Sequence, residues 1–455
     1  MRKKLLLVLP LCLLLAGCGN TAFSSLLSED PASVEEEAPF VEIAGERLDA
    51  GTEELTLAGT PEALDALIEN RELLSSLRDL HLTGELPDVE SYRALREAFP
   101  GAAVTVEPVL FGEKLDSSVR SLDLSAMRPE QMDELLAVLP YFESLEEINF
   151  VSPEGVCAFS VEDIPQLDRL REERPDLYLK LSFELFGQTV TSEDERIEYF
   201  RVPIGDDGAE TVRAVLPYLR SCTYLLMDGC DVDYEIMAKL RDDFPDTKVV
   251  WRIWLCKPYY ESNIITRWYS FLTDTDRIRT VKITNENSHL LKYCTEAKYV
   301  DFGHNMITSE FSFLGYMPKL EVCIIAITGV KDISCLANCP NLEYLEIYGS
   351  QVTDLSPLAN CTKLKHLNCS RLYGLTDITP IYGLDLERLR CVATHVPKEQ
   401  LEEYSRLHPD CEMLLLGGEP HLWGWRYDDH GKMVPRYALL REQLRYDEDR
   451  ANGIP

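Results

Sequence analysis

Apolar residues recur with a period of 22 residues along the C-terminal half of the chain. Three sets share this spacing: Leu320, Leu342, Leu364 and Leu386; Cys323, Leu345, Leu367 and Leu389; and Ile325, Ile347, Cys369 and Cys391. Val300 and Phe302 hold the matching places in an earlier, less regular rung. Each rung reads L-x-x-L-x-L, the alternation of a short strand with one buried face. Such a strand cannot bury its face alone, so the pattern predicts stacked rungs with a continuous core.

A second apolar segment separates successive strands, as in VKDISCLANC (330–339) and VTDLSPLANC (352–361). Upstream, in residues 40–256, a longer and less regular α/β repeat is predicted. Its unit is an amphipathic helix, a proline and alternating apolar residues that continue through a Phe-Gly turn. The prolines are Pro100, Pro175 and Pro245, and the turns are Phe111-Gly112 and Phe186-Gly187. The same helix-proline-strand order closes the array at 401–416.

These patterns predict one curved solenoid over residues 40–416, with a parallel sheet on its concave face; a change of repeat style near 257–296 is left open. The region 257–416 contains the 22-residue rungs, and residues 417–455 form a C-terminal capping tail. In this tail Tyr437, Leu440 and Leu444 recur at helical spacing, which is consistent with a helix that covers the last rung.

The rungs resemble the leucine-rich repeat family, particularly the 22-residue, internalin-like bacterial type with its TDLSPLANCTKL consensus (353–364). Together with the ending GWR…PRY…LRE, the whole arrangement resembles extracellular leucine-rich repeat proteins and lipoproteins of Gram-positive anaerobes. The resemblance implies an α/β leucine-rich repeat solenoid. It also implies a binding or surface protein, since that is what the group as a whole looks like.

Cysteines occupy positions that leucine or isoleucine fills in other rungs. Cys339 and Cys361 share one such position, and Cys369 and Cys391 share another. A free cysteine packs as a small hydrophobic residue, and a 22-residue spacing is not that of a zinc-binding pair, so we expect buried thiols. A disulfide between neighbouring rungs is the alternative, because rungs about 5 Å apart match the Cα separation of a disulfide.

The first 18 residues, MRKKLLLVLPLCLLLAGC, have the pattern of a bacterial signal peptide. A basic start precedes an apolar run that is too short to span a membrane in the mature protein. Leu15-Ala16-Gly17-Cys18 resembles a lipobox, which implies that Cys18 is the lipid attachment site. Residues 19–39 then form an acidic, flexible tether. We expect a protein anchored by lipid alone on the outer face of the cytoplasmic membrane; an ordinary secretory signal is the alternative.

Composition and motifs narrow the classes of function. The net charge is −33, and without Arg2, Lys3 and Lys4 it is −36, from 42 basic and 78 acidic residues. Such a polyanion does not favour nucleic acid. No common catalytic or phosphate-binding motif occurs, and the eight histidines are scattered. We therefore expect no enzyme, no cofactor and no metal, with a calcium loop at Asp228, Asp231 and Asp233 as a weak alternative.

The strand residues between the inward leucines predict a recognition face on the concave sheet. This set is Tyr299, Val322, Ile324, Tyr344, Glu346, Tyr348, His366, Arg388 and Arg390. Tyrosine and arginine are typical anchors of interfaces, although tyrosine and isoleucine are also common in any strand. The sequence thus predicts a non-catalytic scaffold that binds a protein, peptide or glycan. The alternatives are a structural spacer of the envelope and, less favoured, a hydrolase with an unrecognised site.

Overall fold

The computed structural model describes residues 39–256, 269–416 and 424–451. The signal peptide, Cys18 and nearly all of the predicted tether lie outside these ranges. The chain separates into two compact units, Met1–Pro108 with Lys114–Asp116 and Val109–Glu113 with Ser117–Pro455. The first division therefore falls inside the region 40–256. None of the helices in the described ranges has the length and apolarity needed to cross a bilayer.

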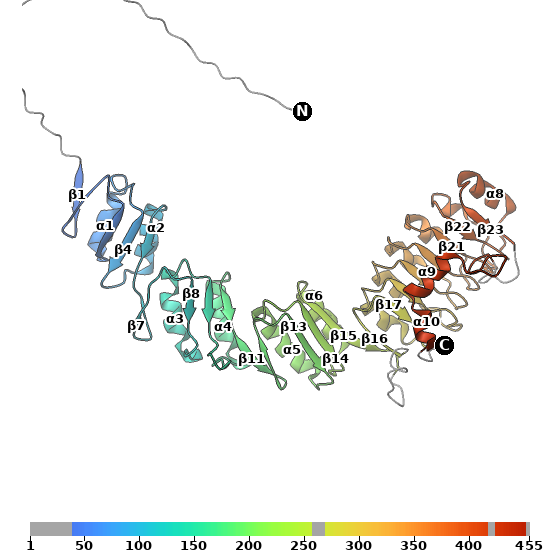
Figure 1. The fold of residues 1–455 in the computed structure, drawn as a ribbon, viewed down its shortest axis with the longest axis horizontal. Helices are drawn as coiled ribbons and strands as arrows, with labels where there is room; N and C mark the ends of the chain where they lie inside the picture. The colour runs from blue at the N-terminus through green and yellow to red at the C-terminus, as the bar shows by residue number, and fades with distance from the viewer. Residues whose placement is uncertain (1–38, 257–268, 417–423, 452–455) are drawn as a thin grey trace, which may run out of the picture. The chain divides into compact units, whose positions relative to one another are not determined.

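The first unit contains a hairpin and a three-stranded parallel sheet (Figure 1). The elements are β1 (Phe40–Ile43), β2 (Glu46–Asp49), β3 (Glu54–Ala58), α1 (Pro61–Glu69), β4 (Asp79–Thr83), α2 (Val89–Ala98) and β5 (Ala103–Thr105). The strands β3, β4 and β5 pair in parallel, and a helix connects each to the next. Leu55 and Leu57 alternate with exposed residues on β3, as expected for a strand with one buried face.

The first part of the second unit repeats this plan twice. One sheet is formed by β8 (Ser121–Asp123), β9 (Glu147–Asn149) and β10 (Tyr178–Lys180), and the other by β13 (Arg196–Phe200), β14 (Tyr224–Asp228), β15 (Lys248–Trp254) and β16 (Ser270–Leu272). The connecting helices are α3 (Met132–Val138), α4 (Ile164–Glu173), α5 (Gly205–Val215) and α6 (Tyr234–Asp243). The short strands are β6 (Val109–Leu110), β7 (Glu113–Lys114), β11 (Ser182–Leu185) and β12 (Gln188–Thr191). All pairs in the two sheets are parallel except β15 with β16.

The predicted helix-proline-strand unit is confirmed. Pro100, Pro175 and Pro245 each follow the last turn of a helix (α2, α4 and α6) and precede a parallel strand. Proline cannot continue a helix, so it fixes where each helix ends. Phe186-Gly187 is the two-residue loop of the β11–β12 hairpin, and both residues have positive φ, 54° and 83°. This is the backbone twist that favours a glycine in tight hairpins.

A seven-stranded parallel sheet forms the core of the predicted 22-residue region. Its strands are β17 (Arg277–Arg279), β18 (Tyr299–Asp301), β19 (Val322–Ile324), β20 (Tyr344–Glu346), β21 (His366–Asn368), β22 (Arg388–Arg390) and β23 (Glu412–Leu414). Leu345 pairs with Leu367, and Leu367 with Leu389, so the register repeats the period of the sequence. Leu345 and Leu367 are both 0% exposed, which confirms that the apolar rung positions face the core.

Short 3-10 helices return the chain from one strand to the next. They are η5 (Ser288–Tyr293), η6 (Ser312–Tyr316), η7 (Ser334–Asn338), η8 (Ser356–Asn360) and η9 (Thr379–Ile381). The helix α8 (Lys398–Leu407) replaces this element before β23, as the closing helix-proline-strand pattern predicts. The chain thus contains a leucine-rich repeat solenoid of mixed α/β class. Rung β17, with Ile278 fully buried, precedes the first rung that the spacing identified.

The strands of residues 40–416 form several sheets, and one division between sheets falls in the region 257–296, where the sequence leaves a change of repeat style open. Within the described ranges, β16 is antiparallel to β15 and pairs with no strand of the seven-stranded sheet. The connections also change along the chain, from α-helices in the N-terminal repeats to mostly 3-10 helices in the C-terminal rungs.

Candidate functional site

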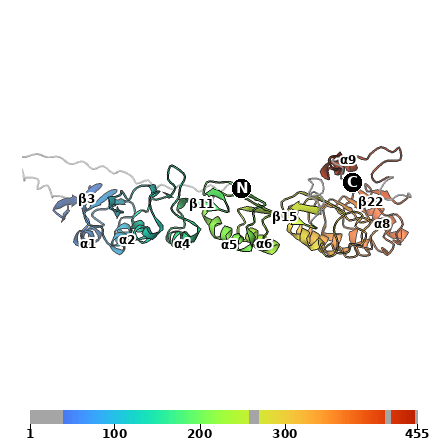
Figure 2. The same cartoon turned by 90° about the horizontal axis from the view of Figure 1, so that it is seen from below.

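The C-terminal tail crosses the open face of the seven-stranded sheet. It contains α9 (Pro435–Gln443) and α10 (Tyr446–Ala451), and Figure 2 shows α9 on the opposite side of this region from the connecting loops. Arg388 of β22 donates from Nη1 to the carbonyl oxygen of Trp425 at 3.1 Å. Further along, Tyr446 donates to Asp301 of β18 at 2.7 Å, and Arg279 of β17 donates to Asp449 at 3.1 Å. The tail therefore runs from β22 back to β17.

An apolar cluster holds the middle of this tail against the sheet. Val322, Ile324, Tyr344 and Tyr348 come from the sheet and the turn after β20, and all are at most 3% exposed. The tail contributes Trp425, Tyr437, Leu440 and Leu444. Burying large aromatic and aliphatic side chains typically stabilises by about 1.5–3 kcal/mol each, so the cluster is part of the protein's core.

The tail was predicted to cover the last rung, and this position is wrong. Tyr437, Leu440 and Leu444 do form a buried helical face, but they cover β19 and β20 in the middle of the sheet and not the last rung. The aromatic and β-branched residues on β19 and β20 offer more apolar surface than the last strand, where Glu412 is exposed.

The carboxylate of Glu346 is the polar centre of this contact. Glu346 is 0% exposed. Its Oε1 accepts hydrogen bonds from Trp425 Nε1 at 2.9 Å and from the Tyr344 hydroxyl, and its Oε2 accepts one from Arg426 Nη2 at 2.9 Å. A buried carboxylate is tolerated only when it is paired and hydrogen-bonded, so these three donors are what allow Glu346 to sit in the apolar cluster.

The predicted recognition face is consequently not accessible. Of its nine residues, seven are buried: Val322, Ile324, Tyr344, Glu346, Tyr348, His366 and Arg390. Tyr299 and Arg388 are partly buried. The expectation of an open face on the concave sheet is contradicted, because the chain's own tail supplies the covering surface. A partner has no access to these side chains while the tail is docked.

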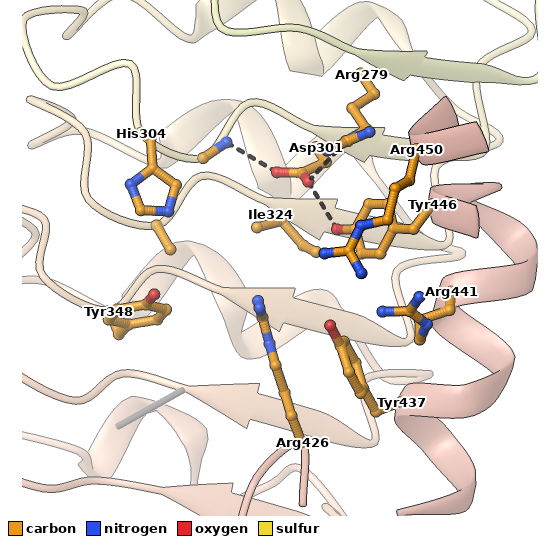
Figure 3. Close-up of a pocket in the computed structure, with 12 residues that line it drawn as sticks. Arg279, Asp301, His304, Ile324, Tyr348, Arg426, Tyr437, Arg441, Tyr446 and Arg450 are labelled. Carbon is orange, nitrogen blue, oxygen red and sulfur yellow. Dashed lines mark hydrogen bonds and ion pairs between the residues drawn. The ribbon is translucent and has the colours of Figure 1, made fainter. Parts of the chain in front are cut away.

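A solvent-filled cavity of about 230 Å³ remains between the tail and the sheet (Figure 3). Four arginines line it: Arg279 from β17, Arg426 from the segment before α9, Arg441 from α9 and Arg450 from α10. Tyr348, Tyr437 and Tyr446 contribute phenol rings, and Asp301 is the one carboxylate among the described lining residues. Figure 3 shows Arg426, Arg441 and Arg450 reaching from the tail toward the sheet.

Carboxylates behind the cavity wall hold three of these arginines in place. Arg279 pairs with Asp449 at 3.1 Å, and its Nε lies 3.7 Å from Asp301. Arg426 pairs with Glu346 at 2.9 Å, and Arg441 pairs with Asp447. The network thus fixes the positions of these guanidinium groups.

Burial and charge set the protonation of the cavity walls. Burial is the largest single influence on Arg426 and disfavours its charged form, but Glu346 together with Tyr344, Tyr446 and Tyr437 outweighs burial and holds the pKa of Arg426 well above its ordinary value. Burial, followed by the charge of Asp301, raises the pKa of Tyr446, and burial with the charge of Glu346 raises that of Tyr348. At neutral pH all three side chains are therefore protonated, and Tyr446 donates its proton to Asp301.

The acidic residues of the weak calcium alternative make contacts within the protein. Asp228, in the weak calcium alternative, is buried and receives two donors of Arg252, the closer at 2.7 Å. Asp233 accepts from the backbone of Glu235 as the N-cap of α6. Within the described ranges, no three His, Cys, Asp or Glu side chains are grouped as a metal ion requires.

The histidines and cysteines also differ in part from expectation. His304 is exposed in a turn and lies at the cavity. His366, a member of the predicted recognition face, is only 7% exposed and lies under the tail. Cys339, Cys361, Cys369 and Cys391 are buried free thiols, which agrees with the prediction that they pack as hydrophobic residues.

Comparisons with known proteins concern the repeats. A family model described as leucine-rich repeats (two copies) matches residues 340–383. No curated protein matches the sequence significantly. Internalin C2 of Listeria monocytogenes is similar at 19% identity over 51% of this chain and 85% of its own, with a TM-score of 0.27.

Two further solved structures cover more of the chain. Internalin F of Listeria monocytogenes has 15% identity over 83% of this chain and 86% of its own, with a TM-score of 0.27. A leucine-rich repeat protein of Leptospira interrogans has 15% identity over 80% and 90%, with a TM-score of 0.28. Similarities this low carry no argument about this chain.

Proposed function

We propose that the protein is a non-catalytic binding scaffold, anchored by lipid on the outer face of the cytoplasmic membrane, that recognises a protein, peptide or glycan. Leucine-rich repeats are typical of binding proteins, and this chain has a rigid seven-stranded repeat sheet. The observation that carries the proposal is the polar cavity of about 230 Å³ that the docked tail leaves on this sheet. In a concave site, convergent polar groups are what fix the orientation of a ligand and give specificity.

Proximity labelling on intact cells, read by mass spectrometry, tests the binding function. The full chain carries the labelling enzyme at its C-terminus, and a reproducible set of neighbours is the expected result. Diffuse labelling of the whole envelope would instead favour a structural spacer. A matched control is the Glu346→Ala variant, which loses the buried carboxylate that fixes the tail over the sheet. Neighbours that depend on the cavity should disappear with this variant.

The lipid anchor has its own support and its own test. A basic start, a short apolar run and Leu15-Ala16-Gly17-Cys18 stand in the order of a bacterial lipoprotein signal. The acyl chains that such a cysteine carries would keep the protein stably bound to a bilayer. Cys18→Ala should leave the precursor uncut or release the protein, as seen by membrane fractionation and gel mobility, whereas Cys12→Ala should change neither. Unchanged processing of Cys18→Ala would reject the anchor.

A further inference from the structure

The cavity lining is far more basic than the chain as a whole. Four guanidinium groups face one carboxylate among the described lining residues, in a protein of net charge −33. They come from β17, the segment before α9, α9 itself and α10, so no single helix or strand accounts for their meeting. Arginines that converge from separate elements on one space are a common arrangement for binding an oxyanion.

Two of these arginines have donors without a partner. Arg426 uses Nη2 for Glu346, but its Nε is buried and makes no hydrogen bond in the described part of the chain. Figure 3 shows the Arg426 side chain between Tyr348 and Tyr437, pointing into the cavity. Arg450 is exposed, and within the described ranges it has neither an ion pair nor a hydrogen bond. A buried donor without a partner is costly, and an acceptor in the cavity would satisfy it.

We infer that the cavity binds a phosphate-type oxyanion, the phosphoryl group by which a larger ligand is held. A planar carboxylate is satisfied by one arginine fork, whereas a tetrahedral group presents oxygens in several directions and suits guanidinium groups from four elements. The hydroxyl of Tyr446 already donates to Asp301, so recognition of this group rests on the guanidinium groups. At about 230 Å³ the cavity is smaller than the usual pocket for a complete small molecule, so it accommodates a terminal group.

Charge balance limits how tightly this group is held. Four carboxylates, those of Asp301, Asp449, Glu346 and Asp447, lie beside or behind the arginines and reduce the positive potential. Arg450 and His304 are exposed, so solvent and salt reach the cavity from that side. Binding should therefore weaken as ionic strength rises. This inference rests on the proposed binding function and names the chemical group that the site takes.

Isothermal titration calorimetry on the full chain in a phosphate-free buffer tests it. The probes are inorganic phosphate, glycerol phosphate and acetate. Arg450→Gln removes an exposed donor and should not disturb folding; it should weaken binding of both phosphate probes about tenfold. Arg445→Gln is the matched control, because Arg445 lies on the same tail and carries the same charge but does not line the cavity. Arg426→Gln should abolish binding, with circular dichroism to check that the chain remains folded.

The outcomes separate the alternatives. Tighter binding of glycerol phosphate than of phosphate supports a phosphoryl group on a larger ligand, and equal binding supports the same site filled by free phosphate. No binding of either probe, acetate binding as tightly as phosphate, or parental affinity in Arg450→Gln would each overturn the inference. If phosphate does not bind but proximity labelling still finds reproducible neighbours, the inference fails and the binding function stands. If phosphate binds and labelling is diffuse, the inference stands and the proposed binding function fails.

Discussion

Replacing Glu346 by alanine should release the C-terminal tail from the repeat sheet without unfolding the repeats. Glu346 is fully buried and accepts from Trp425, Arg426 and Tyr344. The rung below it has a core of its own, since Leu345 and Ile347 point to the other face of the sheet and are 0% exposed. The loss should therefore fall on the contact between tail and sheet.

The magnitude follows from what the alanine leaves behind. Arg426 would remain largely buried without its charge partner, and removing one partner of a buried ion pair costs about 3–5 kcal/mol. The indole of Trp425 and the hydroxyl of Tyr344 would also lose their acceptor, a cost that overlaps with the first and is not added to it. Glu346→Gln keeps an acceptor oxygen and loses only the charge, so about 1–3 kcal/mol is expected.

Hydrogen exchange read by mass spectrometry measures this directly. In Glu346→Ala, amides of the tail peptide 425–446 should exchange between roughly a hundredfold and several thousandfold faster, because each 1.4 kcal/mol of lost protection is about a factor of ten. Amides of the rung segment 352–361 should exchange as in the parent. Glu343→Ala is the matched control: Glu343 is exposed three residues away, so its effect should stay within about 0.5 kcal/mol. Unchanged tail protection in Glu346→Ala would refute the reasoning.

Three further predictions concern the core. Leu345→Asp would bury an unpaired charge and should cost several kcal/mol, seen as a lower urea midpoint with loss of protection in neighbouring rungs. Burial, followed by the positive charge of Arg436, lowers the pKa of His366 to about 3. Between pH 6.5 and 3 the unfolded chain therefore binds a proton that the folded chain does not, so the stability should fall as the pH falls through this window. His366→Gln should flatten this pH dependence of the urea midpoint. All twelve cysteines in the described ranges are free, and among them Cys256 alone is exposed. Iodoacetamide should therefore alkylate Cys256 first in the native protein. If the denatured protein has two fewer reactive thiols than this count requires, a disulfide joins two rungs.

The rungs were predictable because their signal is local and repeated. Each inward position of L-x-x-L-x-L must be apolar for the stack to have a core, so the 22-residue period locates the strands β18–β22 directly. The spacing does not locate rung β17, because the sequence around it lacks the repeated leucines, although Ile278 is as deeply buried as Leu345.

The docking of the tail was not predictable from the same signal. Val322 and Ile324 stand at outward strand positions, and their apolar character indicates only that something covers them. The amphipathic spacing of Tyr437 and Leu440 indicates equally that this helix covers something. Which surface meets which depends on the path of the chain over about a hundred residues, and periodicity contains no information about that path. The buried Glu346 opposite Arg426 is the charge pair that, in retrospect, connects the two segments.

The tail determines the chemistry of the cavity as well as its existence. Arg426, Arg441 and Arg450 reach the site only when the tail is docked, whereas Arg279 and Asp301 belong to the sheet. A ligand that touches both sides must bind the docked state better than the released one, and by linkage it must stabilise docking by the same free energy. At a hundred times its dissociation constant this amounts to about 2.7 kcal/mol, close to the expected cost of removing the Glu346 charge. The apolar face under the tail therefore becomes less accessible when the cavity is filled, so a partner held through the cavity and a partner held by that face would exclude one another.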